Sequence, residues 1–264
     1  MEEFKYKRYH IPNVVKSLCV LRELSKSRAG LTRAEIARKT GYTESIVFRI
    51  IYTMLDYGMI VKDPKTSRYS ISKKFISLAY DAIGEENIIS AAHDVMADIR
   101  DTLVETVMLG ILSENEVIMI DQVFGKNFFS FTGRVGLKCP LNSSAPAKAI
   151  LAFLPEGEVA DILARAEFSR FTANTITDKC RFSDELRSVR QCGYAVDNQE
   201  YLNGANCVGV PVFDYQSRPV AAIWITGPSD RMPNADFPKI GEIMKQKAAA
   251  VSAKLGYSPA AATE

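Results

Sequence analysis

The stretch LTRAEIARKTGYTESIVFRIIYTML, residues 31–55, decides the fold of the N-terminal part of the chain. Thr32 and Glu35 have the spacing of a capping box, in which both side chains accept hydrogen bonds from backbone N–H groups of the first turn. The short helix that they start ends at Gly41, because glycine readily adopts the left-handed conformation of a helix C-terminus. Thr43, a residue type that favours N-caps, begins a longer second helix. This order predicts a helix-turn-helix.

A predicted β-hairpin follows the second helix directly. Residues 58–62 are typical of a strand, residues 63–67 (DPKTS) of a turn, and residues 68–71 of a returning strand. A hairpin at this position is the wing of a winged helix-turn-helix. Apolar residues that recur at helical spacing within residues 13–27 predict a further helix before it.

Charge is distributed unevenly along the 264 residues. Residues 1–80 contain 16 Lys and Arg against 7 Asp and Glu, and residues 81–264 contain 17 against 24, so the net charge of +2 conceals a basic and an acidic part. A basic part joined to an acidic one is typical of a nucleic-acid-binding module attached to another domain. With 47% hydrophobic residues, the composition excludes global disorder. The sequence shows no membrane span and no signal peptide, and we expect a cytoplasmic protein.

The second predicted helix supplies residues for contacting bases. If Val47, Ile51 and Leu55 face the core, the opposite side of the helix is free to enter a major groove, where Arg49 can donate two hydrogen bonds to a guanine edge. Basic residues of the wing and of the N-terminal arm (Lys5, Lys7 and Arg8) can neutralise phosphates. The alternative is a small helical bundle with a solvated basic face. The expected DNA-contacting residues are Thr32, Arg33, Thr43, Glu44, Ser45, Phe48, Arg49, Tyr52, Lys65 and Arg68.

The acidic remainder predicts an α+β sheet domain. A connecting helix over residues 72–83 and a polar break at residues 84–87 precede it. Strand patterns occur at residues 107–112, 116–123, 128–132, 194–197, 205–213 and 220–226, and helical patterns at 88–103, 146–153, 155–166, 182–192 and 236–255. We expect a winged helix domain at residues 1–72, a linker helix at 73–87, the sheet domain at 88–257 and a tail at 258–264.

Motifs of catalysis are scarce in this sequence. No G-x-S-x-G, Walker loop or H-E-x-x-H is present, and five scattered cysteines with two histidines disfavour a metal site. Cys207 has no obvious base, and Asp197 and Glu200 have the spacing of a surface pair. We therefore expect no metal and no cofactor, and a binding role rather than an enzyme.

Seven segments in order resemble the IclR family of bacterial transcriptional regulators. The resemblance implies an N-terminal winged helix-turn-helix joined by a linker helix to a GAF-like α/β effector-binding domain. It also implies a homodimer or homotetramer on palindromic double-stranded operator DNA, since half-sites about one helical turn apart need two recognition helices. The matching segments are residues 17–21, 31–37, 63–69, 140–144 with Lys148 and Ala149, 174–177, 193–200 and 211–214.

The resemblance further implies an effector pocket for a small organic acid: a sugar acid, a keto acid or an aromatic acid. Backbone N–H groups at a helix N-terminus favour such an anion, although Pro146 lacks an N–H. Trp224, the only tryptophan, stands where the family has a small residue, so its indole either lines or fills the cavity. Two alternatives stay open: a ligand-blind DNA-binding protein with a closed pocket, and an enzyme fused to a DNA-binding domain. The implied effector-contacting residues are Ser144, Ala145, Pro146, Asp197, Cys207, Trp224 and Thr226.

Overall fold

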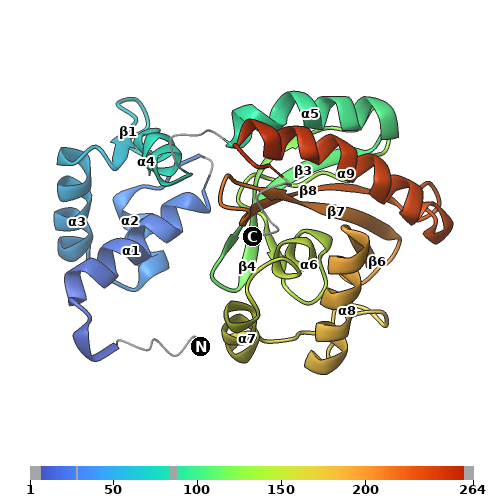
Figure 1. Cartoon of the computed structure of the whole chain (residues 1–264). Coiled ribbons are helices and arrows are strands. Elements are labelled where there is room, and N and C mark those ends of the chain that lie inside the picture. Colours follow the sequence, from blue (N-terminus) through green and yellow to red (C-terminus); the bar gives the residue numbers. More distant parts are fainter. Residues whose placement is uncertain (1–6, 28, 84–87, 259–264) are drawn as a thin grey trace. The chain divides into compact units, whose positions relative to one another are not determined.

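A computed structural model describes residues 7–27, 29–83 and 88–258 of the chain, which divides into two compact units (Figure 1). The first unit comprises residues 1–85 and the second residues 86–264. The predicted polar break at residues 84–87 and the arm residue Lys5 lie outside the described residues.

Among the described residues, the first unit contains the α-helices α1 to α4, the short 3-10 helix η1 and a two-stranded hairpin. The hairpin strands are antiparallel, with Ile60 opposite Ile71, and an isolated bridge joins Leu31 to Tyr69 at their side. This arrangement confirms the predicted winged helix-turn-helix. Its elements in order are η1 (Lys7–Tyr9), α1 (Pro12–Ser25), α2 (Arg33–Thr40), α3 (Glu44–Asp56), β1 (Ile60–Lys62), β2 (Tyr69–Ile71) and α4 (Lys74–Ile83).

Local signals set the boundaries of α2 and α3. The Thr32 hydroxyl accepts from the Glu35 N–H at 3.3 Å, and the Glu35 carboxylate accepts from the Thr32 N–H at 2.8 Å, which confirms the capping box. Gly41 ends α2 with a φ of 73°, as predicted. Thr43 occupies the N-cap position of α3, but its side chain makes no capping hydrogen bond.

The second unit is a six-stranded antiparallel sheet with helices on both faces. The strand order is β5-β4-β3-β8-β7-β6. Helices α5 and α9 pack together over one face, and α6 packs against the other face beside α8 (Figure 1). The elements are α5 (Ile88–Leu103), β3 (Thr106–Ser113), β4 (Glu116–Val123), β5 (Lys138–Pro140), α6 (Ala145–Leu151), α7 (Glu156–Arg165), α8 (Lys179–Cys192), β6 (Ala195–Asn198), β7 (Ala205–Phe213), β8 (Pro219–Pro228), η2 (Asn234–Asp236) and α9 (Phe237–Lys254).

One predicted strand is wrong. Residues 128–132 form no strand, and the edge of the sheet is instead the short β5, which pairs with Glu116–Ile118 of β4. Two aromatic residues of this segment, Phe128 and Phe129, are exposed, whereas Phe131 is half-buried. Aromatic residues favour strands only where a neighbouring strand supplies backbone partners, and here the Phe129 carbonyl accepts from the Arg231 guanidinium.

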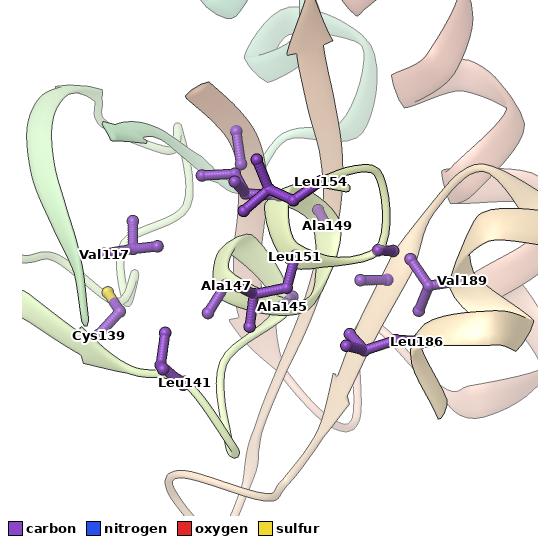
Figure 2. Close-up of a cluster of buried hydrophobic side chains, with 14 of the residues drawn as sticks. Val117, Cys139, Leu141, Ala145, Ala147, Ala149, Leu151, Leu154, Leu186 and Val189 are labelled. Carbon is purple, nitrogen blue, oxygen red and sulfur yellow. The ribbon is translucent and has the colours of Figure 1, made fainter. Parts of the chain in front are cut away.

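Helix α6 lies in the middle of the core of the second unit. Figure 2 shows its side chains Ala145, Ala147 and Leu151 with Val117, Cys139 and Leu141 on one side and Leu186 and Val189 on the other. The backbone of α6 lies so close to β7 at Gly209 that a Cβ at that residue would be 3.0 Å from the carbonyl carbon of Ala145. The N-terminus of α6 is thereby held against the sheet.

Candidate DNA interface and ligand pocket

Helix α3 has an apolar face toward the core and an exposed face opposite. Val47, Ile50, Ile51 and Met54 are buried, whereas Leu55, expected in the core, is only half-buried. The exposed face carries an aromatic pair, in which the ring centroids lie 4.4 Å apart. The predicted DNA-contacting residues that the structure places on this face, all exposed, are Thr43, Glu44, Ser45, Phe48, Arg49 and Tyr52.

An ion pair joins the first residues of α2 and α3. The Arg33 guanidinium donates from Nε to Glu44 Oε2 at 3.0 Å, and its carbon lies 5.9 Å from the centre of the Phe48 ring. Glu44, one of the predicted DNA-contacting residues, is therefore already paired with Arg33. Glu44 and Arg33 are both half exposed, so the pair lies at the surface that α3 presents.

The two basic residues of the wing that were predicted to contact DNA, Arg68 and Lys65, have different surroundings. The half-buried Arg68 donates to the Gly30 carbonyl at 2.9 Å and to both Glu35 carboxylate oxygens, at 3.0 and 3.3 Å. This guanidinium joins the hairpin to α2. Lys65 is exposed in the turn, where the Asp63 carboxylate accepts its backbone N–H at 2.7 Å. These backbone hydrogen bonds, with that of Thr66, lower the pKa of Asp63.

The remaining predicted DNA-contacting residues belong to the start of α2 and to the N-terminal arm. The half-buried Thr32 spends its hydroxyl on the capping box. In the arm, the guanidinium carbon of Arg8 lies 4.7 Å from the centre of the Tyr9 ring. No side-chain position is described for Lys7.

The second unit contains a pocket of about 150 Å³ beside the N-terminus of α6. All seven residues that the family resemblance implied line this one pocket: Ser144, Ala145, Pro146, Asp197, Cys207, Trp224 and Thr226. Further lining residues, which the sequence analysis did not name, are Met108, Phe131, Thr132, Leu137, Cys139, Pro140, Tyr201, Leu202 and Ala205.

Strand register brings the polar residues of the pocket together. Asp197 of β6 lies opposite Cys207 of β7, and Cys207 lies opposite Thr226 of β8. The Cys207 thiol and the Thr226 hydroxyl are 3.4 Å apart. The result is a row of a carboxyl, a thiol and a hydroxyl group across three adjacent strands.

Asp197 is a buried carboxyl group with 4% of its surface exposed. Its Oδ1 accepts from the Glu200 N–H at 2.6 Å and from the Tyr201 N–H at 3.4 Å. Burial raises the pKa of Asp197 to about 7, because the charged form loses its hydration, and the Glu200 carboxylate adds to this effect. Burial and the Asp197 carboxyl group also raise the pKa of the Cys207 thiol.

Trp224 lines the pocket and packs in the core at once. Its indole is buried, and a Cβ at Gly110 of the neighbouring strand would lie 3.0 Å from Cζ3 of the ring. The glycine therefore makes room for the indole against the sheet. A cavity remains beside the ring, so Trp224 does not close the pocket.

A buried lysine behind the pocket was missed in the sequence analysis. Lys148 of α6 has no exposed surface, and its Nζ donates to Glu200 at 2.5 Å, to Glu185 at 3.2 Å and to the Val196 carbonyl at 2.8 Å. Glu200 is buried as well, so the expectation of Asp197 and Glu200 at the surface is wrong. The available signal was a lysine within APAKAIL, which is otherwise apolar, because such a lysine needs buried acidic partners.

The described part of the chain contains neither a candidate metal site nor a helix suited to cross a membrane. Within residues 7–27, 29–83 and 88–258, no group of three or more His, Cys, Asp and Glu side chains is arranged to hold a metal ion. Among the same residues, no helix combines the length and the apolar character needed to cross a membrane.

A winged helix-turn-helix and a sheet domain with a buried pocket, together on one chain, define a DNA-binding transcriptional regulator. The family model for the IclR helix-turn-helix domain matches residues 13–64, and that for the bacterial transcriptional regulator IclR C-terminal domain matches residues 80–253. The chain belongs to the IclR family.

Individual relatives agree with this assignment. The chain is 29% identical over 248 residues to the HTH-type transcriptional regulator KdgR of Dickeya chrysanthemi, with 94% of this chain and 81% of KdgR covered. It is 33% identical to the chain in the crystal structure of Thermotoga maritima IclR, with a TM-score of 0.78. The match covers 94% of this chain and 100% of the Thermotoga chain. An IclR homologue of Microbacterium hydrocarbonoxydans, crystallised with 4-hydroxybenzoate, shares the fold at 20% identity, with a TM-score of 0.80 and 93% and 100% covered.

Proposed function

We propose that the protein regulates transcription by binding a palindromic operator through α3, and that a small organic acid in the pocket modulates this binding. The observation that carries the proposal is the exposed face of α3, with Ser45, Phe48, Arg49 and Tyr52, in a chain of this regulator family. Residues 1–72 are the DNA-binding domain, residues 73–87 the linker and residues 88–257 the effector-binding domain. Because operator DNA lies in the cytoplasm of bacteria, we expect the protein to act there.

Direct readout of bases falls to the centre of the exposed face. Arg49 donates to a guanine, and Ser45 bonds a base or a phosphate. Lys65, in the turn of the wing, neutralises a phosphate. Arg68 and Arg33 act differently, because both are paired within the unit: they hold the wing and the start of α3 in position.

A homo-oligomer is supported by α1. Its exposed surface includes Val14 at 51% and Leu18 at 59%, and Ile11 just before the helix is 65% exposed. Apolar side chains that gather on one helix favour burial against another protein surface. A second copy of the chain would cover them and place two α3 helices on the two halves of a palindrome.

The effector pocket favours a compact acid. Its volume of about 150 Å³ and its largely apolar walls suit a keto acid or an aromatic acid better than an extended sugar acid. The homologue crystallised with 4-hydroxybenzoate supports an aromatic acid as the first probe.

The pocket geometry weighs against both alternatives. A ligand-blind protein would have its pocket filled by Trp224, whereas the indole leaves a cavity. An enzyme using Cys207 as nucleophile would need a lowered thiol pKa, whereas burial and Asp197 raise the pKa of this thiol.

Footprinting of genomic fragments with the full-length protein, with and without a panel of small organic acids, tests the proposal. We expect protection of a two-fold symmetric site that at least one acid changes. Arg49→Ala should weaken binding to that site by about 1–3 kcal/mol while leaving binding to random DNA nearly unchanged. Equal losses on both DNAs would contradict base reading by Arg49. Arg38→Ala, on the exposed side of α2, is the matched control.

A further inference from the structure

The described residues that line the pocket include an acidic side chain but no basic one. Among the described residues that line it, Asp197 is a carboxyl group, and none is a lysine, an arginine or a histidine. The other polar side chains are neutral, and the Ser144 hydroxyl is already donated to the Pro140 carbonyl at 2.7 Å. A ligand carboxylate in this pocket would therefore meet no side-chain cation.

The buried cation of α6, Lys148, already has hydrogen-bond partners outside the pocket. Lys148 Nζ makes three contacts, to Glu200, to Glu185 and to the Val196 carbonyl, and has no exposed surface. The carboxylates of Glu200 and Glu185 therefore already share the single positive charge of Lys148. This leaves Lys148 without a free charge to pair with the carboxylate of an effector.

The other titratable groups around Asp197 add no positive charge. From the chain after β6 come Glu200 and Tyr201, and from β7 and β5 come the thiols of Cys207 and Cys139. Lys148 of α6, by contrast, favours the ionised form of Asp197, but its ammonium group already pairs with Glu185 and Glu200. Burial and the Glu200 carboxylate outweigh this attraction, so the surroundings of Asp197 disfavour further negative charge.

Two carboxyl groups in one poorly hydrated site avoid repulsion by sharing a proton. Asp197 has the geometry for this: its Oδ1 accepts the Glu200 and Tyr201 N–H groups, while Oδ2 has no hydrogen bond to the backbone among the described residues. A proton on Oδ2 would turn the carboxyl group into a donor toward a ligand in the pocket.

We infer that an acid effector enters this pocket together with one proton, which Asp197 Oδ2 and the effector carboxylate share. Where Asp197 is ionised in the free protein, the proton comes from solvent on binding and returns to solvent on release; where Asp197 is already protonated, its own proton is the one shared. This inference rests on the proposed function and defines its ligand class: compact monocarboxylic acids bind, and dianions are rejected. Affinity should fall as pH rises above neutrality.

The ionisation of the free pocket agrees with this inference. Burial raises the pKa of Asp197 to about 7, so the carboxyl group holds its proton at mildly acidic pH and loses it at alkaline pH. Above that pKa, an uptake of one proton weakens the apparent affinity by about tenfold per pH unit.

A titration of Asp197 without ligand tests the first half of the inference. Carboxyl infrared or carbon NMR signals of the full-length protein would be followed with pH, and the signal lost in Asp197→Asn would be assigned to this residue. Asp94→Asn, at an exposed position of α5, makes the same charge change as a control. A midpoint near neutrality supports the inference, and a midpoint near that of an ordinary aspartate overturns it.

Calorimetry with benzoate, 4-hydroxybenzoate and pyruvate as probes tests the second half. Titrations at about pH 6 and about pH 8, each in two buffers of different ionisation heat, count the protons taken up on binding. Because Asp197 already holds its proton at about pH 6, we expect little proton uptake there, about one proton taken up at about pH 8, and about tenfold weaker binding at the higher pH. Neither effect should occur in Asp197→Asn.

The outcomes separate the inference from the proposed function. Acids that bind the wild-type protein at about pH 8 without proton uptake overturn the inference and leave an acid-responsive regulator intact. The same pH dependence in Asp197→Asn also overturns it. If none of the probes binds even at about pH 6, the proposed effector class fails, and the inference fails with it.

Discussion

At the scale of single residues, burial decides what a side chain does. Asp197 and Asp94 are chemically identical, but Asp197 is 4% exposed beside a pocket whereas Asp94 lies at the surface of α5. Lys148 and Lys138 differ in the same way, with 0% and 68% of their side chains exposed. In each pair, the buried member is the one whose charge affects the ligand pocket or its support.

Asp197→Asn should change how stability depends on pH. Because the folded pKa of Asp197 is about 7 and the ordinary value is 3.8, the folded state keeps a proton that the unfolded state releases between these values. The free energy of unfolding of the wild-type protein therefore falls as pH rises through this window. The asparagine variant lacks this loss, so its stability relative to wild type should rise from about pH 4 to about pH 7 and then level off. Urea unfolding across this range measures the difference, and a constant difference would contradict the shifted pKa.

Lys148→Met should destabilise the protein strongly. It leaves the Glu200 and Glu185 carboxylates without their shared cation, and Glu200 is buried. We expect a loss of about 3 kcal/mol or more in the free energy of unfolding, measured with urea. Lys138→Met breaks the exposed pair with Glu116 and should cost less than about 1 kcal/mol. Equal losses in the two variants would show that Lys148 contributes packing alone.

At the scale of elements, the wing is held to the helices by a polar clamp. Glu35 caps α2 and also accepts the Arg68 guanidinium, while Gly30, at a φ of 71°, lets the chain pass next to the Tyr69 carbonyl. A Cβ at Gly30 would lie 2.7 Å from that carbonyl oxygen. One carboxylate therefore connects a helix N-terminus to the hairpin.

Arg68→Ala and Lys65→Ala should act on DNA binding in different ways. Removing Arg68 frees the hairpin from α2, so we expect a lower melting temperature and weaker operator binding. Removing Lys65 should leave the melting temperature unchanged, weaken binding to all DNA and reduce the slope of affinity against salt by about one phosphate contact. Thermal denaturation and fluorescence anisotropy at several salt concentrations distinguish the two. An unchanged melting temperature in Arg68→Ala would contradict the clamp.

Much of the element order was predictable from the sequence. The bounds of α5 and β7 agree with the predicted residues 88–103 and 205–213, because amphipathic periodicity and β-branched runs are properties of consecutive residues. The strand predicted at residues 128–132 is wrong, because pairing with a neighbouring strand decides which of two segments becomes the edge. The seven predicted pocket residues line one cavity, but they were implied by family resemblance and not by any local pattern.

At the scale of the whole molecule, the proposed function needs two copies of α3 held at a fixed separation. A palindromic operator matches a two-fold symmetric protein, and a ligand can regulate it only by binding one arrangement better than another. The exposed apolar residues of α1 supply a surface for such an assembly.

Leu18→Glu should therefore weaken the oligomer. The side chain is 59% exposed in the single chain, so the substitution should leave the fold of the unit intact and place a charge in the proposed contact. We expect a lower molar mass in analytical ultracentrifugation, and a larger loss of affinity for a palindrome than for an isolated half-site relative to the wild-type protein. Tyr57→Glu, at a position 69% exposed after α3, is the control. An unchanged mass would remove α1 from the interface.

The sequence by itself determined the helix-turn-helix, its wing and the order of most elements. Caps, glycines and apolar periodicity act between residues a few positions apart, so they are visible in the sequence. Only the tertiary structure decided that Asp197, Cys207 and Thr226 form one row, and that Lys148 meets Glu200 across 52 positions of sequence. Burial and charge at such sites depend on strand register and helix packing, which bring distant residues together and exclude water from between them.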